Sequence, residues 1–168
     1  MEYKKIIIVD DQDRIVGYKD WKDIDWSKDK VRASSVWVED SAGNILMQKR
    51  GEHLEFNPGK LTFAVGGIND EGDTYESTAI REAHEEIGLD LVDLEELGII
   101  PFQEKIRSGF IDYFKAIIPG NRPKINFDPN EVADVQWFSK DDLRKHMKDN
   151  PDMFVDRTLE VPFKFRLL

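Results

Sequence analysis

The sequence has no cysteine in its 168 residues. Disulfide bonds, thiolate metal sites and cysteine nucleophiles are therefore excluded, and a reducing, cytoplasmic location is expected. No apolar run approaches the roughly 20 residues that a membrane-spanning helix needs, so we expect no membrane partner. Any chemistry in this chain must rest on oxygen and nitrogen side chains.

Positive charge is also scarce. The chain has 24 Lys and Arg against 34 Asp and Glu, which gives a net charge of −10. Such a chain repels a polyphosphate backbone, so we expect no nucleic-acid polymer as a partner. A small anion can still bind where a metal ion or local basic side chains offset the repulsion. With 40% hydrophobic residues and no repeat or linker, the sequence predicts a single globular domain over residues 1–168.

Segments typical of strands and helices follow one another without regular alternation. Strands are predicted at Lys5–Val9, Arg14–Tyr18, Val31–Val38, Ile45–Arg50, Leu61–Val65, Leu97–Phe102, Phe110–Ile118 and Val132–Phe138. Helices are predicted over Thr74–Ile87 and from Ser139 to about Lys148, whereas the tail Pro151–Leu168 fits no single element. A glycine-rich loop is expected at Gly66–Gly72. This order predicts an α+β fold with a mixed sheet and an N-terminal hairpin.

The predicted helix Thr74–Ile87 carries a concentration of acidic residues. Asp73 is expected to cap its start and Gly88 to end it. Three carboxylates occupy one arc of its surface, those of Glu82, Glu85 and Glu86. Like charges at this spacing each cost a few tenths of a kcal/mol, whereas converging carboxylates are what Mg²⁺ requires. An acidic face alone is more often simply solvated, so the surrounding spacing decides between the two.

That spacing is specific. Gly67 is followed by five residues and Asp73, and then by seven residues and the segment Arg81–Leu89. The pattern from Gly67 to Leu89 resembles the Nudix box, in which a glycine, an acid and an Arg-Glu-x-x-Glu-Glu-x-Gly core recur at these distances. Asp73 replaces the family's glutamate. Its side chain is one methylene shorter, so the sequence does not decide whether it reaches the same contact. Ala83 replaces a bulkier aliphatic residue, and the Phe56–Gly59 loop also resembles the family.

The resemblance implies a Nudix fold, an α/β/α sandwich in which a mixed β-sheet lies between helices. It implies Mg²⁺ or Mn²⁺ held by Glu82, Glu85, Glu86 and the backbone carbonyl of Gly66. Such a metal neutralises diphosphate oxygens and helps activate water, so the implied activity is cleavage of a diphosphate linkage. Arg81 is expected to orient a glutamate by ion pairing. Glu131 is a candidate base or additional metal ligand.

The substrate is less well specified by the sequence. Lys49 and Arg50 end a predicted strand and are candidates for binding substrate phosphate, although such charges are more often solvated. The expected partner is a small-molecule diphosphate, namely a nucleoside diphosphate linked to another moiety. Specificity for that moiety lies in loops outside the box. A homodimer is compatible with the sequence.

Two alternatives to hydrolysis stay open. The N-terminal hairpin resembles the isopentenyl-diphosphate isomerase-like branch of the family, whose chemistry uses a cysteine and a histidine-rich metal site. The corresponding positions here are Gly66, Ile68 and Val31, which disfavours isomerisation. The second alternative is a non-catalytic nucleotide-binding sensor. Sensors usually lose box glutamates, and this chain keeps all three.

Overall fold

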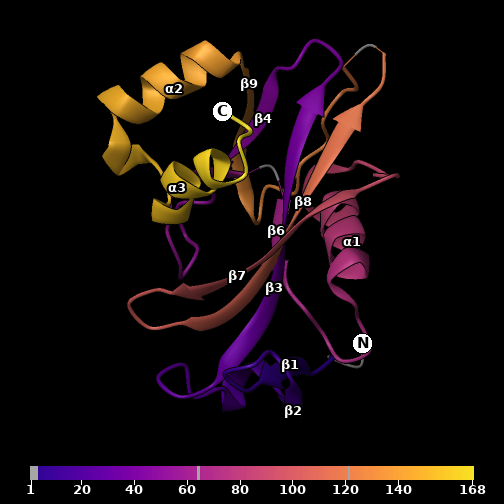
Figure 1. The fold of residues 1–168 in the computed structure, drawn as a ribbon, viewed down its shortest axis with the longest axis vertical. Helices are drawn as coiled ribbons and strands as arrows, with labels where there is room; N and C mark the ends of the chain where they lie inside the picture. The colour runs from indigo at the N-terminus through magenta and orange to yellow at the C-terminus, as the bar shows by residue number, and fades with distance from the viewer. Residues whose placement is uncertain (1–3, 64, 121) are drawn as a thin grey trace.

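The computed structural model describes residues 4–63, 65–120 and 122–168 (Figure 1). Its strands are β1 (Ile6–Val9), β2 (Ile15–Lys19), β3 (Lys30–Asp40), β4 (Ile45–Arg50), β5 (Leu61–Phe63), β6 (Val65–Ile68), β7 (Glu95–Gln103), β8 (Ser108–Ile118) and β9 (Val132–Phe138). Its helices are η1 (Trp21–Asp23), α1 (Tyr75–Ile87), α2 (Lys140–Asp149), η2 (Pro151–Met153) and α3 (Asp156–Lys164). All the predicted strands and both predicted helices are present within a few residues of their expected bounds.

The strands form a mixed sheet with β3 at its centre. β3 pairs antiparallel with β1, β4 and β6, and it pairs parallel with β8 along its whole length. β5 and β9 both pair with β4, while β7 extends the sheet beyond β8 and β2 beyond β1. Because a central strand is covered on both faces, β3 is buried continuously from Ser34 to Asp40, polar residues included.

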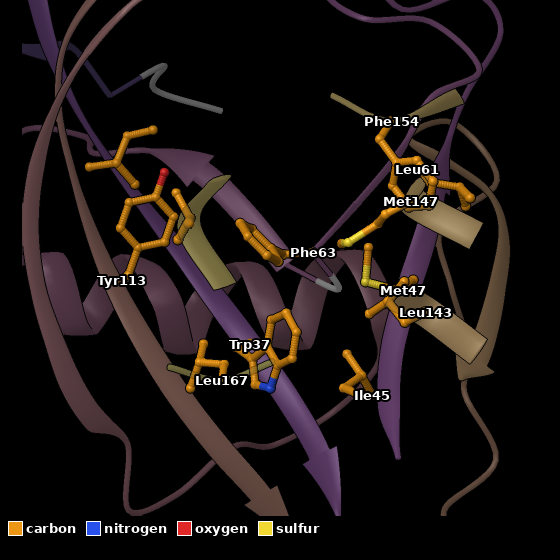
Figure 2. Close-up of a cluster of buried hydrophobic side chains, with 12 residues drawn as sticks. Trp37, Ile45, Met47, Leu61, Phe63, Tyr113, Leu143, Met147, Phe154 and Leu167 are labelled. Atoms are coloured by element: carbon orange, nitrogen blue, oxygen red, sulfur yellow. The ribbon is translucent and has the colours of Figure 1, made fainter. Parts of the chain in front are cut away.

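Helices cover both faces of this sheet. Val36 and Val38 of β3 point to one face, where they pack with the α1 residues Ala79, Ala83 and Ile87. Trp37, between the two valines, points to the other face and packs beneath α2 and α3. Figure 2 shows this second core, in which Trp37 lies with Met47, Phe63, Tyr113, Leu143 and Leu167. The predicted α/β/α sandwich is therefore confirmed.

The ends of α1 are set by local chemistry. Thr74 and Ser77 form a reciprocal capping box, in which the Ser77 N–H donates to Thr74 Oγ1 at 3.0 Å and the Thr74 N–H donates to Ser77 Oγ at 2.9 Å. Gly88 ends the helix in the left-handed region, at φ 65°, as predicted. The cap predicted at Asp73 was wrong by one residue. Because Thr74 serves as the cap, the Asp73 carboxylate is free to accept a hydrogen bond from Arg81.

The other corrections concern the segment before α1 and the tail. Gly66 and Gly67, predicted as a loop, lie in β6, because the central strand β3 supplies their backbone partners. Ala64, within the predicted strand Leu61–Val65, lies outside the described residues. The tail forms η2 and α3, whose Val161 helps to cover the second core. In the described residues no helix is long and apolar enough to cross a membrane.

The N-terminal hairpin is present and lies against the sheet's lower end in Figure 1. Ile6, Ile8, Ile24 and Val31 form a small core of their own between it and β3. The Ile7 N–H donates to the Asn69 carbonyl at 3.1 Å, which joins the hairpin to the connection between β6 and α1. The hairpin is thus attached to the segment that leads into α1.

Candidate active site

A cavity of about 530 Å³ collects most of the predicted site residues. Its walls come from the N-terminal hairpin, β3, the β4–β5 loop, α1, the β7–β8 turn and α3. Five of the predicted residues line it, namely Arg50, Gly66, Glu82, Glu86 and Glu131. A volume of this size suits a small molecule rather than a polymer.

Glu86 is the most enclosed acid in this cavity. It is 3% exposed, and its Oε2 accepts hydrogen bonds from the Gly66 N–H at 3.2 Å and from Gln48 Nε2 at 3.4 Å. Burial raises its pKa well above the ordinary value, and the negative charges of Glu82 and Glu131 raise it further. Arg50 opposes this shift only in part. The cavity therefore holds more negative charge than the protein neutralises.

Glu82 lies one turn earlier on the same face of α1. Burial raises the pKa of Glu82 to about 7, although the Arg81 guanidinium counteracts this shift. A Cβ atom on Gly67 would lie 2.2 Å from the Glu82 carboxyl group. Only glycine therefore allows β6 and this carboxyl group to approach so closely. The closeness of the Glu82 carboxyl group thus explains on steric grounds why position 67 is a glycine.

Arg81 holds an acidic network behind the cavity. Its Nη1 donates to Glu82 Oε1 at 2.8 Å and to Glu85 Oε2 at 3.0 Å. Its Nη2 lies 3.3 Å from Asp73 Oδ2 and 3.5 Å from Asp70 Oδ2. Asp73 therefore reaches the box arginine despite its shorter side chain. Arg81 does not line the cavity, so its contact with the Glu82 carboxylate is made outside the cavity.

Three of the residues weighed from the sequence point elsewhere. The Glu85 side chain is 57% exposed and does not line the cavity, because it turns toward Arg81. Lys49 pairs with Glu52 at 2.8 Å on the outer side of β4, which is the solvated arrangement. His84 is exposed, as expected, and contacts Asp90. Within the described ranges, no three Asp, Glu, His or Cys side chains converge closely enough to hold a metal ion.

Three arginines also line the cavity, and the part of it that they form is called the arginine end below. Arg50 Nε donates to the Phe56 carbonyl at 3.0 Å, and burial together with the charges of Arg157 and Arg107 lowers its pKa. All three arginines line the cavity. Sequence patterns could not single out Arg107 or Arg157, because one lies in a turn and the other in a tail without a recognisable motif.

The comparison with known proteins settles the family. The NUDIX domain model matches residues 29–157. The chain belongs to the Nudix family. It is 30% identical over 136 residues to an uncharacterised Nudix hydrolase of Yersinia pestis, covering 81% of this chain and 73% of that protein. It is 31% identical over 121 residues to an isopentenyl-diphosphate Delta-isomerase of Aliivibrio fischeri, covering 68% and 67%. A crystal structure from Deinococcus radiodurans shares the Nudix fold, with a TM-score of 0.71 at 22% identity over 88% and 90% of the two chains.

The donor chemistry of this Nudix protein suits a hard divalent cation, although the three carboxylates do not converge on one point in this structure. Glu82 and Glu86 are enclosed carboxylates, the charge of Glu82 raises the pKa of Glu86, and the charge of Glu131 raises the pKa of both. Oxygen donors are what Mg²⁺ and Mn²⁺ prefer, and a dication is the species that removes such repulsion. Without a cation the site relieves its charge by protonation instead.

Proposed function

We propose that this Nudix protein is a Mg²⁺-dependent hydrolase that cleaves a diphosphate linkage in a nucleoside diphosphate derivative. The observation that carries the proposal is the enclosed pair Glu82 and Glu86, which lines the same cavity as three arginines. A diphosphate bridging a metal and Arg50 would satisfy both ends at once. The expected cytoplasmic location and the possible homodimer remain predictions.

Each residue has a role in this proposal. Glu82 and Glu86 would hold the metal together with the Gly66 carbonyl, and Glu85 would join them by turning from Arg81. The bound metal supplies charge neutralisation and an activated water. Arg81 is a positioning residue, because it touches Glu82 and Glu85 but not the cavity. Glu131, which lines the cavity, is the candidate base.

The apolar wall of the cavity supports a nucleoside as one half of the substrate. Trp21 of η1 lines the cavity and is 48% exposed, so its ring is available to a planar ligand. It makes an edge contact with Trp26, which holds it in place at 5.2 Å between ring centroids. Ile68 and Phe102 continue this wall. A base resting on Trp21 would leave the diphosphate in the polar half of the cavity.

Isomerisation is the second candidate, because an isomerase is among the relatives at 31% identity. The three positions that correspond to the isomerase groups, Val31, Gly66 and Ile68, all line the same cavity. None of them has a side chain that transfers a proton or binds a metal. Hydrolysis therefore fits this cavity better than isomerisation does.

The test is a panel of nucleoside diphosphate derivatives incubated with Mg²⁺, with mononucleotide release as the readout. Glu86→Gln and Glu85→Gln should each lower kcat by at least ~10²-fold, the scale of losing a principal charge-stabilising group. Glu76→Gln is the matched control, since Glu76 is an exposed glutamate on the same helix. Full activity in excess EDTA, or unchanged turnover in Glu86→Gln, would overturn the proposal. Conversion of isopentenyl diphosphate to dimethylallyl diphosphate would favour the second candidate.

A further inference from the structure

The arginine end of the cavity carries more positive charge than a single diphosphate contact needs. Arg50, Arg107 and Arg157 all line it, and Arg50 is close enough to the other two for their charges to lower its pKa. The charges of Glu86 and Glu131 also act on Arg50. Arg107 and Arg157 are therefore considered as a separate pair.

The Glu104 carboxylate accepts hydrogen bonds from both Arg107 and Arg157. Glu104 Oε2 accepts from Arg107 Nε at 3.1 Å and from Arg107 Nη2 at 2.6 Å, while Glu104 Oε1 accepts from Arg157 Nη1. Glu104 itself does not line the cavity. Two guanidinium groups on one carboxylate leave a net positive charge, and both guanidinium-bearing residues line the cavity.

The two side chains are also fixed in place before any ligand arrives. The Arg107 guanidinium lies 3.9 Å from the centroid of the Phe56 ring, which orients its plane. Arg157 Nε is buried and has no hydrogen-bond partner among the described residues. A buried donor left without a partner is costly, so the contact with Glu104 is not a fully satisfied structural salt bridge.

We propose that Arg107 and Arg157 form a second anion subsite, which binds a phosphate group of the substrate other than the two in the scissile diphosphate. This inference rests on the proposed function, because it assigns the scissile diphosphate to the metal and Arg50. Guanidinium groups bind phosphate oxygens in a bidentate way, and they do so most strongly where water is excluded. The substrate class is then a nucleoside diphosphate derivative that bears an additional phosphomonoester.

Matched substrate pairs test this directly. Coenzyme A with dephospho-coenzyme A, and NADPH with NADH, each differ by one phosphomonoester. Wild type should prefer the phosphorylated member of at least one pair, and Arg157→Gln should lower kcat/KM for that member by ~10–100-fold, the scale of one charge-assisted hydrogen bond or two. The partner lacking the phosphate should change by less than about twofold. Arg144→Gln, on the exposed side of α2, is the control. Equal losses on both members would overturn the subsite.

A binding measurement separates this inference from the proposed function. Inorganic phosphate, added in EDTA at constant ionic strength, should raise the melting temperature of wild type and raise that of Arg157→Gln less. If that difference appears while no diphosphate is hydrolysed, the subsite stands and the hydrolase proposal falls. If phosphate shifts both proteins equally, or neither, the subsite is wrong whatever the activity. Arg107→Gln gives the same readout should Arg157→Gln fail to fold.

Discussion

Two pairs of buried carboxylates in this molecule have opposite electrostatic surroundings. Glu39 and Asp40 end β3 and are 5% and 6% exposed, while Glu86 and its neighbour Glu82 are enclosed on α1. Both carboxylates of the first pair have cationic or N–H partners. Glu39 accepts a hydrogen bond from the Trp37 ring N–H and forms ion pairs with Lys115 and Lys140. Asp40 accepts hydrogen bonds from Ala42, Asn44 and Arg122.

The pKa values follow from those partners. Burial alone would raise the pKa of Asp40, but hydrogen bonds from Asn44, Arg122 and Ala42 outweigh it and lower that pKa to about 2. Burial raises the pKa of Glu82 to about 7, and there the partners do not outweigh it. Burial is common to both pairs, so compensation is what separates the structural acids from those that we propose for function. An uncompensated pair must either take up protons or be completed by a cation from outside the chain.

The largest expected effect on stability comes from removing Asp40, a member of the compensated pair. Asp40→Ala removes the acceptor of the β3–β4 turn and leaves Arg122 without its carboxylate, so the free energy of unfolding should fall by about 2–4 kcal/mol. Thermal melts measure this, with Asp141→Ala as the control, because the Asp141 side chain is 95% exposed. A loss no greater than that of the control would mean that the partners of Asp40 contribute nothing.

The same variant has a defined pH dependence. The pKa of Asp40 in the fold, about 2, lies below its ordinary value of 3.8. Its contribution to stability is therefore fully present above about pH 4 and is lost as the pH falls toward 2. The difference in melting temperature between wild type and Asp40→Ala should shrink over that interval. A difference that is constant with pH would show that the lost contacts are not those of the charged form.

A smaller effect should come from disturbing the uncompensated pair by steric means. Gly67→Ala puts a methyl group where the Glu82 carboxyl group lies, so that carboxyl group must move by an ångström or more. Displacement on this scale should lower kcat by ~10-fold or more. Stability should change little, because the displaced atoms are the end of a flexible side chain. Gly17→Ala is the control, since a Cβ there meets nothing within 4 Å. Unchanged turnover would show that the position of Glu82 does not matter.

Residues that act through local spacing could be predicted from the sequence, and residues that act through tertiary contact could not. The period of α1 and the distance from Gly67 placed Glu82 and Glu86 correctly on one face, because both signals are contained in 23 residues. The i, i+4 spacing does place Arg81 beside Glu85, but periodicity could not predict that the Glu85 side chain stays out of the cavity, since that depends on a side-chain rotamer. Gly66 and Gly67 read as a loop because paired glycines usually break strands, whereas β3 supplies the partners. Arg107 and Arg157 meet only through the packing of the β7–β8 turn against α3.

The smallest expected effect on stability comes from neutralising Glu86, a member of the uncompensated pair. Glu86→Gln keeps the side chain's size and nearly its helix propensity while it fixes this buried side chain in a neutral form, as protonation does in the metal-free wild type. The new amide oxygen can still accept from the Gly66 N–H, and the new amide N–H₂ can donate to Gln48 Oε1, which has no partner within the described residues. The metal-free variant should therefore be as stable as wild type, or more stable by up to about 1 kcal/mol, whereas neutralising Asp40 destabilises.

Melts of both proteins in EDTA and across a Mg²⁺ series, at constant ionic strength, measure this difference. Mg²⁺ should raise the wild-type melting temperature in a concentration-dependent way, because it binds only the folded cluster, and it should raise that of Glu86→Gln less. A metal-free variant that melts well below wild type would make Glu86 a structural acid like Asp40. Equal shifts with Mg²⁺ would place the metal elsewhere, because a ligand stabilises a fold only through the groups it binds. The two pairs would then differ in partners without differing in function.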